Sequence, residues 1–343
     1  LARATAGGAK LQLNDSGLAR PWAVERRMTT TRAYPIGTPG QPWGEAERQA
    51  WRARQPRLRS YASDVEPRIA ALASRFERIL YGRLDYAGES YDLYALRTRA
   101  WDPTLPAALI TGGVHGYETS GVEGALEFLE KQAERYAGRI NLLVAPCVSP
   151  WAYERINRWN YDAVDPNRSF RADSPSIEAS SLMALVAAQA DQFRLHIDLH
   201  ETTDSDESEF RPALAARDGK PFEPGFIPDG FYLVADVSEP QLAFQQAIIS
   251  AVAKVTHIAP PDPDGQLIGC PILSDGVIAY PVRTIDMCPS ITAAPYTTTT
   301  EVYPDSPRAT PQQCNDAQVA AICAALDFVT FGAGGRADQS GIG

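Results

Sequence analysis

Short apolar runs alternate with longer amphipathic segments through most of this 343-residue chain. The apolar runs have the length of buried strands, and the amphipathic segments repeat apolar residues at helical spacing. This alternation predicts an α/β protein with a mixed, mostly parallel central β-sheet that helices cover on both faces. We expect strands at 107–111, 140–148, 193–199 and 231–235, and helices at 118–136, 177–189, 240–255 and 316–328.

The remaining segments add few elements. Two more helices and a hairpin are expected at 45–54, 65–80 and 81–96. Residues 1–40 are rich in Gly, Thr, Arg and Pro and show no periodicity, which predicts an extended or poorly ordered arm. Residues 41–335 then form a single domain, with a loop-rich insertion near 201–230.

Composition excludes several classes of function. The formal net charge is −10, so a polyanion such as nucleic acid is repelled on average. No apolar stretch approaches the length that crosses a bilayer, so no membrane partner is expected. The five cysteines form no Cys-x-x-Cys pair, which argues against a disulfide scaffold and favours a cytoplasmic location. A secreted or periplasmic location stays open if a signal peptide was removed, and no feature indicates an oligomeric state.

A first polar segment follows the predicted strand at 107–111. Gly112 and Gly113 open a loop, and His115 and Glu118 follow before the next helix. In open α/β sheets, ligands bind beyond the carboxyl ends of strands, and imidazole and carboxylate are ordinary zinc ligands. The pair alone is a weak signal, because Glu118 would also favour the helix dipole, and a third ligand is required.

A second polar segment lies on the strand at 193–199. Strand alternation puts His196, Asp198 and His200 on one face. His200 is nearest the exit of the strand and is the best third ligand. His196 fits better as a hydrogen-bonded core histidine.

A third segment carries two arginines. The planar guanidinium of Arg168 could bind a carboxylate, with Asn167 as a further donor. Arg158 could face an oxyanion, and Asp165 could orient a metal-bound histidine. Taken alone, both arginines could equally be solvated surface charges.

The three segments occur as Gly-Gly-x-His-Gly-x-Glu, then Arg-x-Asn-x-x-x-Val-Asp-x-Asn-Arg-x-Phe, then Asp-Leu-His. In this order they resemble the zinc carboxypeptidase family, also called funnelins. The same superfamily contains succinylglutamate desuccinylase and aspartoacylase. The resemblance covers roughly residues 85–330 and implies a zinc carboxypeptidase-like α/β/α fold. Ala163 and Ser169 depart from the family, which usually has Gly and often has Asn at these positions.

The resemblance implies roles for residues of all three segments. One zinc ion would have three protein ligands, namely His115, Glu118 and His200. Asp165 would support His115, and Arg158 would polarise the scissile carbonyl. Asn167 and Arg168 would anchor the terminal carboxylate of the substrate.

The family also requires residues from the C-terminal half. Glu301 follows a β-branched run and would be the general base, although it also reads as a surface acid before Pro304. Tyr280 and Tyr296 are candidates for a tyrosine that closes on the substrate, and each could instead be a packed aromatic. Asp286 resembles the specificity position and would favour Lys or Arg at the C-terminus of the substrate.

The function expected from these residues is a zinc-dependent metallocarboxypeptidase that hydrolyses a C-terminal amide bond. The alternative is an N-acyl amino acid deacylase, because Asp198-Leu-His-Glu-Thr-Thr is close to the deacylase motif. A third reading is a metal-free relative that only binds carboxylates. The substrate would be a peptide or an N-acyl amino acid with a free carboxylate. Acidic residues in 201–209 could steer basic peptides or could form a solvated loop.

Overall fold

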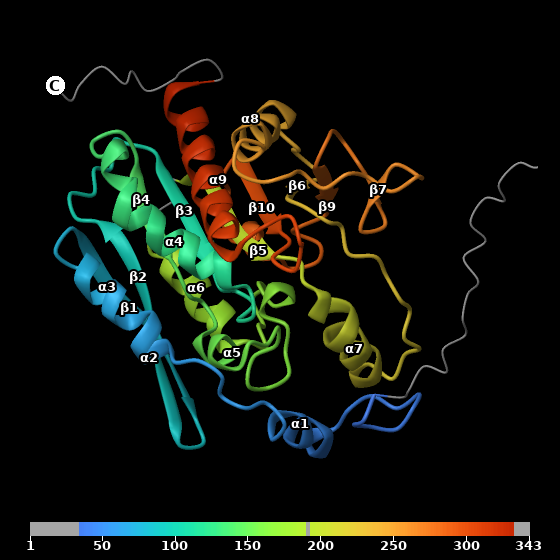
Figure 1. Cartoon of the computed structure of the whole chain (residues 1–343). Coiled ribbons are helices and arrows are strands. Elements are labelled where there is room, and N and C mark those ends of the chain that lie inside the picture. Colours follow the sequence, from blue (N-terminus) through green and yellow to red (C-terminus); the bar gives the residue numbers. More distant parts are fainter. Residues whose placement is uncertain (1–33, 190–192, 333–343) are drawn as a thin grey trace, which may run out of the picture. The chain divides into compact units, whose positions relative to one another are not determined.

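The computed structural model describes residues 34–189 and 193–332, and within them eight strands form one mixed sheet (Figure 1). The strands lie in the order β1–β2–β4–β3–β5–β10–β6–β9. Their bounds are β1 Phe76–Tyr86, β2 Glu89–Thr98, β3 Ala107–Gly112, β4 Asn141–Ala145, β5 Phe193–Glu201, β6 Tyr232–Asp236, β9 Val277–Tyr280 and β10 Tyr296–Val302. The central strands β4, β3, β5 and β10 are parallel, whereas β1, β2 and β6 add antiparallel pairs. The predicted mixed, mostly parallel sheet is confirmed.

Helices cover both faces of this sheet. On one face α4 (Thr119–Lys131), α8 (Leu242–Val252) and α9 (Pro311–Phe331) pack together, and α6 (Ile177–Ala187) lies in the core of the other face. Strand β3 shows why two layers are needed. Ala108 and Ile110 join the core on the α4 face, while Ala107 and Leu109 join the core on the α6 face. Because residues 107–110 of β3 are all apolar and buried, neither face of this strand could be left in water.

Shorter elements surround the two layers. The helices are α1 (Glu45–Arg52), α2 (Tyr61–Asp64), α3 (Glu66–Leu72), α5 (Pro150–Arg155) and α7 (Arg211–Arg217). Single turns are η1 (Ala133–Tyr136), η2 (Pro166–Arg168), η4 (Cys288–Ile291) and the π-helix η3 (Asp206–Phe210). A small hairpin pairs β7 (Gln266–Leu267) with β8 (Cys270–Pro271).

Three sequence expectations differ from the structure. The predicted helix 65–80 is wrong beyond α3, because Phe76 and Ile79 belong to β1, where pairing with β2 prevails over the helical spacing. In the predicted loop-rich insertion 201–230, residues 206–217 are helical. The short strand β9 was not expected. Most of the predicted arm 1–40 lies outside the described residues.

Helix α9 requires a further correction. Among the described residues it is the one helix long and apolar enough to cross a membrane, by length and composition only, so the expectation that no stretch approaches that length is wrong. The helix packs against α4 and α8. One of its faces is buried in the core through Cys314, Ala317, Gln318, Ala321, Ile322, Ala325 and Leu326. These contacts fit a core helix of the α/β domain.

Candidate functional site

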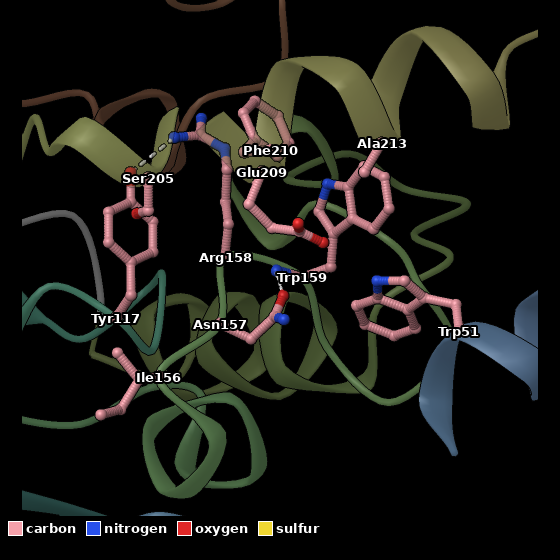
Figure 2. A pocket seen from close by; sticks show the side chains of 10 residues that line it. All are labelled: Trp51, Tyr117, Ile156, Asn157, Arg158, Trp159, Ser205, Glu209, Phe210 and Ala213. Carbon is pink, nitrogen blue, oxygen red and sulfur yellow. Dashed lines mark hydrogen bonds between the residues drawn. The ribbon is translucent and has the colours of Figure 1, made fainter. Parts of the chain in front are cut away.

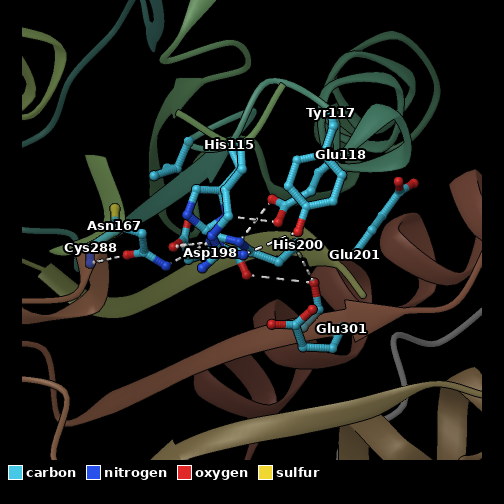
Figure 3. Close-up of polar contacts among 12 residues, drawn as sticks. His115, Tyr117, Glu118, Asn167, Asp198, His200, Glu201, Cys288 and Glu301 are labelled. Carbon is cyan, nitrogen blue, oxygen red and sulfur yellow. Dashed lines mark hydrogen bonds and ion pairs between the residues drawn. The ribbon is translucent and has the colours of Figure 1, made fainter. Parts of the chain in front are cut away.

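Two neighbouring parallel strands bring together three side chains that could ligate a metal ion (Figure 3). His115 and Glu118 follow β3, and His200 lies near the end of β5. One donor atom from each residue lies within 4.8 Å of the others, and all three side chains are buried. His115 Nδ1 is 2.7 Å from Glu118 Oε1, and His200 Nδ1 is 2.8 Å from Glu118 Oε2. The convergence that the two sequence motifs predicted is present.

The orientation of the two imidazoles suits a divalent cation. Each ring turns Nδ1 toward Glu118 and Nε2 toward another carboxylate. His115 Nε2 lies 2.9 Å from Asp165 Oδ1, and His200 Nε2 lies 2.6 Å from Asp198 Oδ2. A carboxylate at Nε2 holds the proton there and leaves the Nδ1 lone pair for a metal. Two imidazole nitrogens and one carboxylate are a donor set that zinc prefers.

The state of Glu118 supports the same conclusion. Burial opposes its charge, but the neighbouring imidazoles outweigh burial and hold the pKa of Glu118 at about 2. Its Oε2 atom is buried and accepts no hydrogen bond of good geometry, despite the short approach of His200. A buried, ionised carboxylate oxygen without a hydrogen bond is costly. A cation among the three donors would satisfy it.

Asp198 is a further candidate residue of the site, and sequence reasoning left it without a role. The alternation of β5 predicted its shared face with His200, but the contact was not assigned. In the structure its Oδ1 accepts a 2.6 Å hydrogen bond from Thr111 Oγ1, which aims Oδ2 at His200. His196 is the expected core histidine. Burial lowers its pKa to about 4, and its ring lies near the hydroxyls of Thr111 and Thr292.

Arg158 is held between two carboxylates. Its Nε donates to Asp165 Oδ2 at 3.1 Å, and its Nη1 lies 3.5 Å from Asp206 Oδ1. Figure 2 shows Arg158 between Tyr117 and Phe210. These residues and Trp159 line a small cavity of about 40 Å³. The Tyr117 hydroxyl accepts from Nη1 at 3.1 Å, and the guanidinium carbon lies 4.3 Å from the Phe210 ring centre. The arginine is therefore fixed in place rather than solvated.

A larger cavity, which we call the central cavity, lies beside these groups and has a volume of about 240 Å³. Four residues expected at the site line it, namely Arg158, Arg168, Tyr280 and Glu301. Tyr232 and Ile268 contribute further walls. Tyr296, the other candidate tyrosine, packs instead against Phe244 and Phe328 in the core.

Glu301, the expected general base, lines the central cavity. It lies on β10 in register with His200 on β5, so the strand pairing sets its distance from the metal-binding group. Its Oε2 accepts a 2.9 Å hydrogen bond from Thr202 Oγ1. Burial raises the pKa of Glu301 to about 8 when no metal is present. A carboxylate with a pKa near neutral pH is suited to both accepting and returning a proton.

The predicted carboxylate-binding pair is divided in the structure. Arg168 lines the central cavity, donates to the Asn167 carbonyl at 2.6 Å and forms no ion pair with any described residue. Asn167 is buried outside that lining. Its Oδ1 accepts from the Cys288 amide at 2.8 Å, and its Nδ2 lies 3.3 Å from His200 Nε2. The side chain of Asn167 thus packs beside His200, which differs from the expected contact with substrate.

Asp286 is also placed differently from the expectation. Its carboxylate pairs with Arg171 at 2.8 Å, and its carbonyl accepts from the Phe170 amide. Its backbone has a positive φ of 54°, which turns the side chain within a loop. Asp286 is not among the residues that line the central cavity, so this arrangement offers no acidic wall for a basic side chain.

Of the five acidic residues in 201–209, Asp204 and Glu209 are exposed, whereas the other three lie against the protein. Glu201 accepts hydrogen bonds from the amides of Ser120 and Thr119 at the start of α4. Asp206 pairs with Arg158, and Glu207 pairs with Arg211. Each of these three acids therefore has a local structural partner.

Comparison with known proteins agrees with this geometry. Residues 104–219 match the succinylglutamate desuccinylase/aspartoacylase catalytic domain. No curated protein matches the sequence. A Shewanella amazonensis SB2B protein described as a putative metallopeptidase has a similar structure, with a TM-score of 0.59, 22% identity, and coverage of 78% of this chain and 94% of that one.

Two carboxypeptidases have the same fold at lower identity. The metallo-carboxypeptidase of Burkholderia cenocepacia has a TM-score of 0.52 and 14% identity, with 84% of this chain and 69% of that chain covered. The carboxypeptidase A of Helicoverpa armigera has a TM-score of 0.52 and 15% identity, with 78% and 73% covered. These structures establish a carboxypeptidase-like α/β fold for the chain.

Proposed function

We propose that this chain, whose fold and whose segment 104–219 are similar to those of the zinc carboxypeptidase-like superfamily, is a zinc metallocarboxypeptidase. The observation that carries the proposal is the unpaired guanidinium of Arg168. Its half-buried guanidinium lines the same cavity as Glu301 and has no ion-pair partner among residues 34–189 and 193–332. An unpaired guanidinium at a reaction site recognises a carboxylate. A substrate held there would present the amide bond next to its free carboxylate to Glu301.

The chemistry follows from the residues around the cavity. His115, Glu118 and His200 would hold one zinc ion, which supplies Lewis acidity and makes a water more acidic. Glu301 takes a proton from the attacking water and returns it to the leaving amine. Arg158, fixed by two carboxylates, donates to the oxygen that becomes negative in the transition state.

A second candidate function is N-acyl amino acid deacylation. The match of residues 104–219 to the desuccinylase/aspartoacylase catalytic domain favours it. Both functions hydrolyse an amide bond beside a carboxylate and use the same residues. They differ in the group on the acyl side of the scissile bond, which is a peptide in one case and a small acid in the other.

One mixed substrate pool tests both functions. The zinc-loaded protein is incubated with peptides of varied C-terminal residues and with N-acetyl and N-succinyl amino acids, and products are followed by mass spectrometry against a chelator-treated sample. Loss of single C-terminal residues supports the carboxypeptidase. Release of amino acids from the acylated compounds alone supports the deacylase. Cleavage within peptides, or no hydrolysis of either class, would overturn the proposal.

The role of Arg168 is tested with matched substrates and variants. We expect Arg168→Gln to raise KM for free-acid substrates about tenfold or more, because one charge-assisted contact is lost. Amidated peptides, which lack the carboxylate, should be poor substrates of both proteins. Arg171→Gln is the control, since that arginine is nearby and exposed but pairs with Asp286.

A further inference from the structure

A second cavity adjoins the central one and shares Arg158, Arg168 and Phe210 with it. Its volume is about 430 Å³, within the range of about 300–1,000 Å³ usual for small-molecule sites. We call it the arginine cavity, because four arginines line it, namely Arg48, Arg158, Arg168 and Arg217. The chain as a whole has a formal net charge of −10, so this concentration of cations is local.

Two of the four arginines are neutralised within the cavity. Asp165 pairs with Arg158 at 3.1 Å, and Asp218 pairs with Arg217 at 2.9 Å. These are the only acidic side chains among the described residues that line the cavity. The arginine cavity therefore has two more positive than negative side chains.

The surplus resides on Arg48 and Arg168. Arg48, from α1, donates to the backbone carbonyl of Asp162 at 2.7 Å, while the Asp162 carboxylate faces Arg52. Arg168 likewise donates to a backbone carbonyl, that of Asn167. In the part of the chain that the structure describes, neither guanidinium has an ion-pair partner. Each one retains N–H donors for an anion.

Packing holds the cavity arginines in position before any ligand arrives. Arg217 lies 4.6 Å from the Trp159 ring centre and donates to the Ala163 carbonyl at 3.1 Å. The backbone contact of Arg48 fixes α1 to the same loop. Donors fixed in advance lose little conformational entropy when they bind an anion. Such an arrangement is typical of a recognition site rather than of mobile surface arginines.

We propose that the arginine cavity receives an acidic side chain of the substrate's C-terminal residue, with Arg48 as the specificity-determining residue. This rests on the proposed function, in which Arg168 binds the α-carboxylate. Arg168 borders both cavities, and the side chain of that residue begins on the carbon that bears the α-carboxylate. The side chain of a C-terminal Glu or Asp would therefore extend toward Arg48, which is the opposite of the basic preference expected from Asp286.

Steady-state kinetics test the proposal. Four acylated dipeptides that differ only in a C-terminal Glu, Gln, Leu or Lys are compared with the zinc-loaded protein. We expect kcat/KM for Glu to exceed that for Gln about tenfold or more, the effect of a charged rather than neutral partner. Arg48→Gln should reduce that ratio. Arg54→Gln is the control, because Arg54 is exposed just beyond α1 and does not line the cavity.

A binding measurement separates this proposal from the proposed function. Glutamate and leucine, the corresponding products, are titrated calorimetrically into the chelator-treated protein. If glutamate binds more tightly than leucine and Arg48→Gln abolishes the difference, the cavity assignment is supported, even when no peptide is hydrolysed. A lack of hydrolysis would overturn only the proposed function. Equal binding of the two amino acids, or equal kcat/KM for Glu, Leu and Lys, would overturn the cavity assignment alone. Arg48→Lys keeps the positive charge and should retain part of the preference for glutamate. Loss of glutamate binding in Arg48→Gln alone is then due to the missing charge rather than to misfolding.

Discussion

Replacing Asp198 with Asn is expected to weaken zinc binding by about 10–100-fold, which corresponds to roughly 1.4–2.7 kcal/mol. The carboxylate lies 2.6 Å from His200 Nε2, is fully buried and is fixed by Thr111. Asparagine has the same shape, and its amide can still pair with both neighbours, because the Thr111 hydroxyl can also accept. The change therefore removes the charge that makes His200 a stronger ligand while keeping the packing.

Competition with a chromophoric chelator measures this effect without any substrate. Wild type, Asp198→Asn and Asp85→Asn are compared, because Asp85 is an exposed acid on β1 that pairs with Arg83. Thermal melting of the chelator-treated proteins establishes that each variant is folded. A zinc affinity of Asp198→Asn within twofold of wild type would refute the assignment of Asp198 as the residue that orients His200.

Three further outcomes follow. Glu301→Gln should lower kcat by about 10²–10⁴-fold at unchanged zinc affinity, and substantial residual activity would contradict its role as base. In chelator, burial raises the pKa of Glu301 to about 8, so the folded chain retains a proton that the unfolded chain loses. The free energy of unfolding should therefore fall as pH rises from about 5 to 8. Urea unfolding of Glu301→Gln should show a flatter pH dependence. Gly116→Ala should prevent stable folding, because a Cβ there would lie 2.0 Å from the Ala152 carbonyl carbon; Gly44→Ala, which faces a flexible side chain, should yield soluble protein with a normal melting temperature.

The sequence predicted the metal-binding group because its residues are tied to strand ends. His115, Glu118 and His200 follow apolar runs whose order in a parallel sheet brings their exits together. For Glu301 the β-branched run predicted the strand, whereas the role of general base came from the family resemblance. Which acid contacts which imidazole nitrogen depends on side-chain positions in three dimensions, so Asp198 received no role.

Residues in loops were harder to predict. The directions of Asn167 and Asp286 depend on the path of the backbone, including the positive φ at Asp286, and no local pattern encodes these contacts. Arg48 lies more than a hundred residues before Arg168 and reaches the same cavity only through the packing of α1. The helical spacing of Phe76 and Ile79 was misleading, because strand pairing is a long-range effect that a local window does not contain.

Asp165 joins two parts of the site through a single carboxylate, since Oδ1 faces His115 and Oδ2 accepts from Arg158. When His115 coordinates a cation, its Nε2–H becomes a stronger donor and draws negative charge of Asp165 away from Arg158. More of the positive charge of Arg158 is then available to an anionic ligand. Thermodynamic reciprocity requires that an anion bound at Arg158 tighten the cation at His115 by the same factor. Metal retention in this protein should therefore vary with occupancy of the central cavity by an anion.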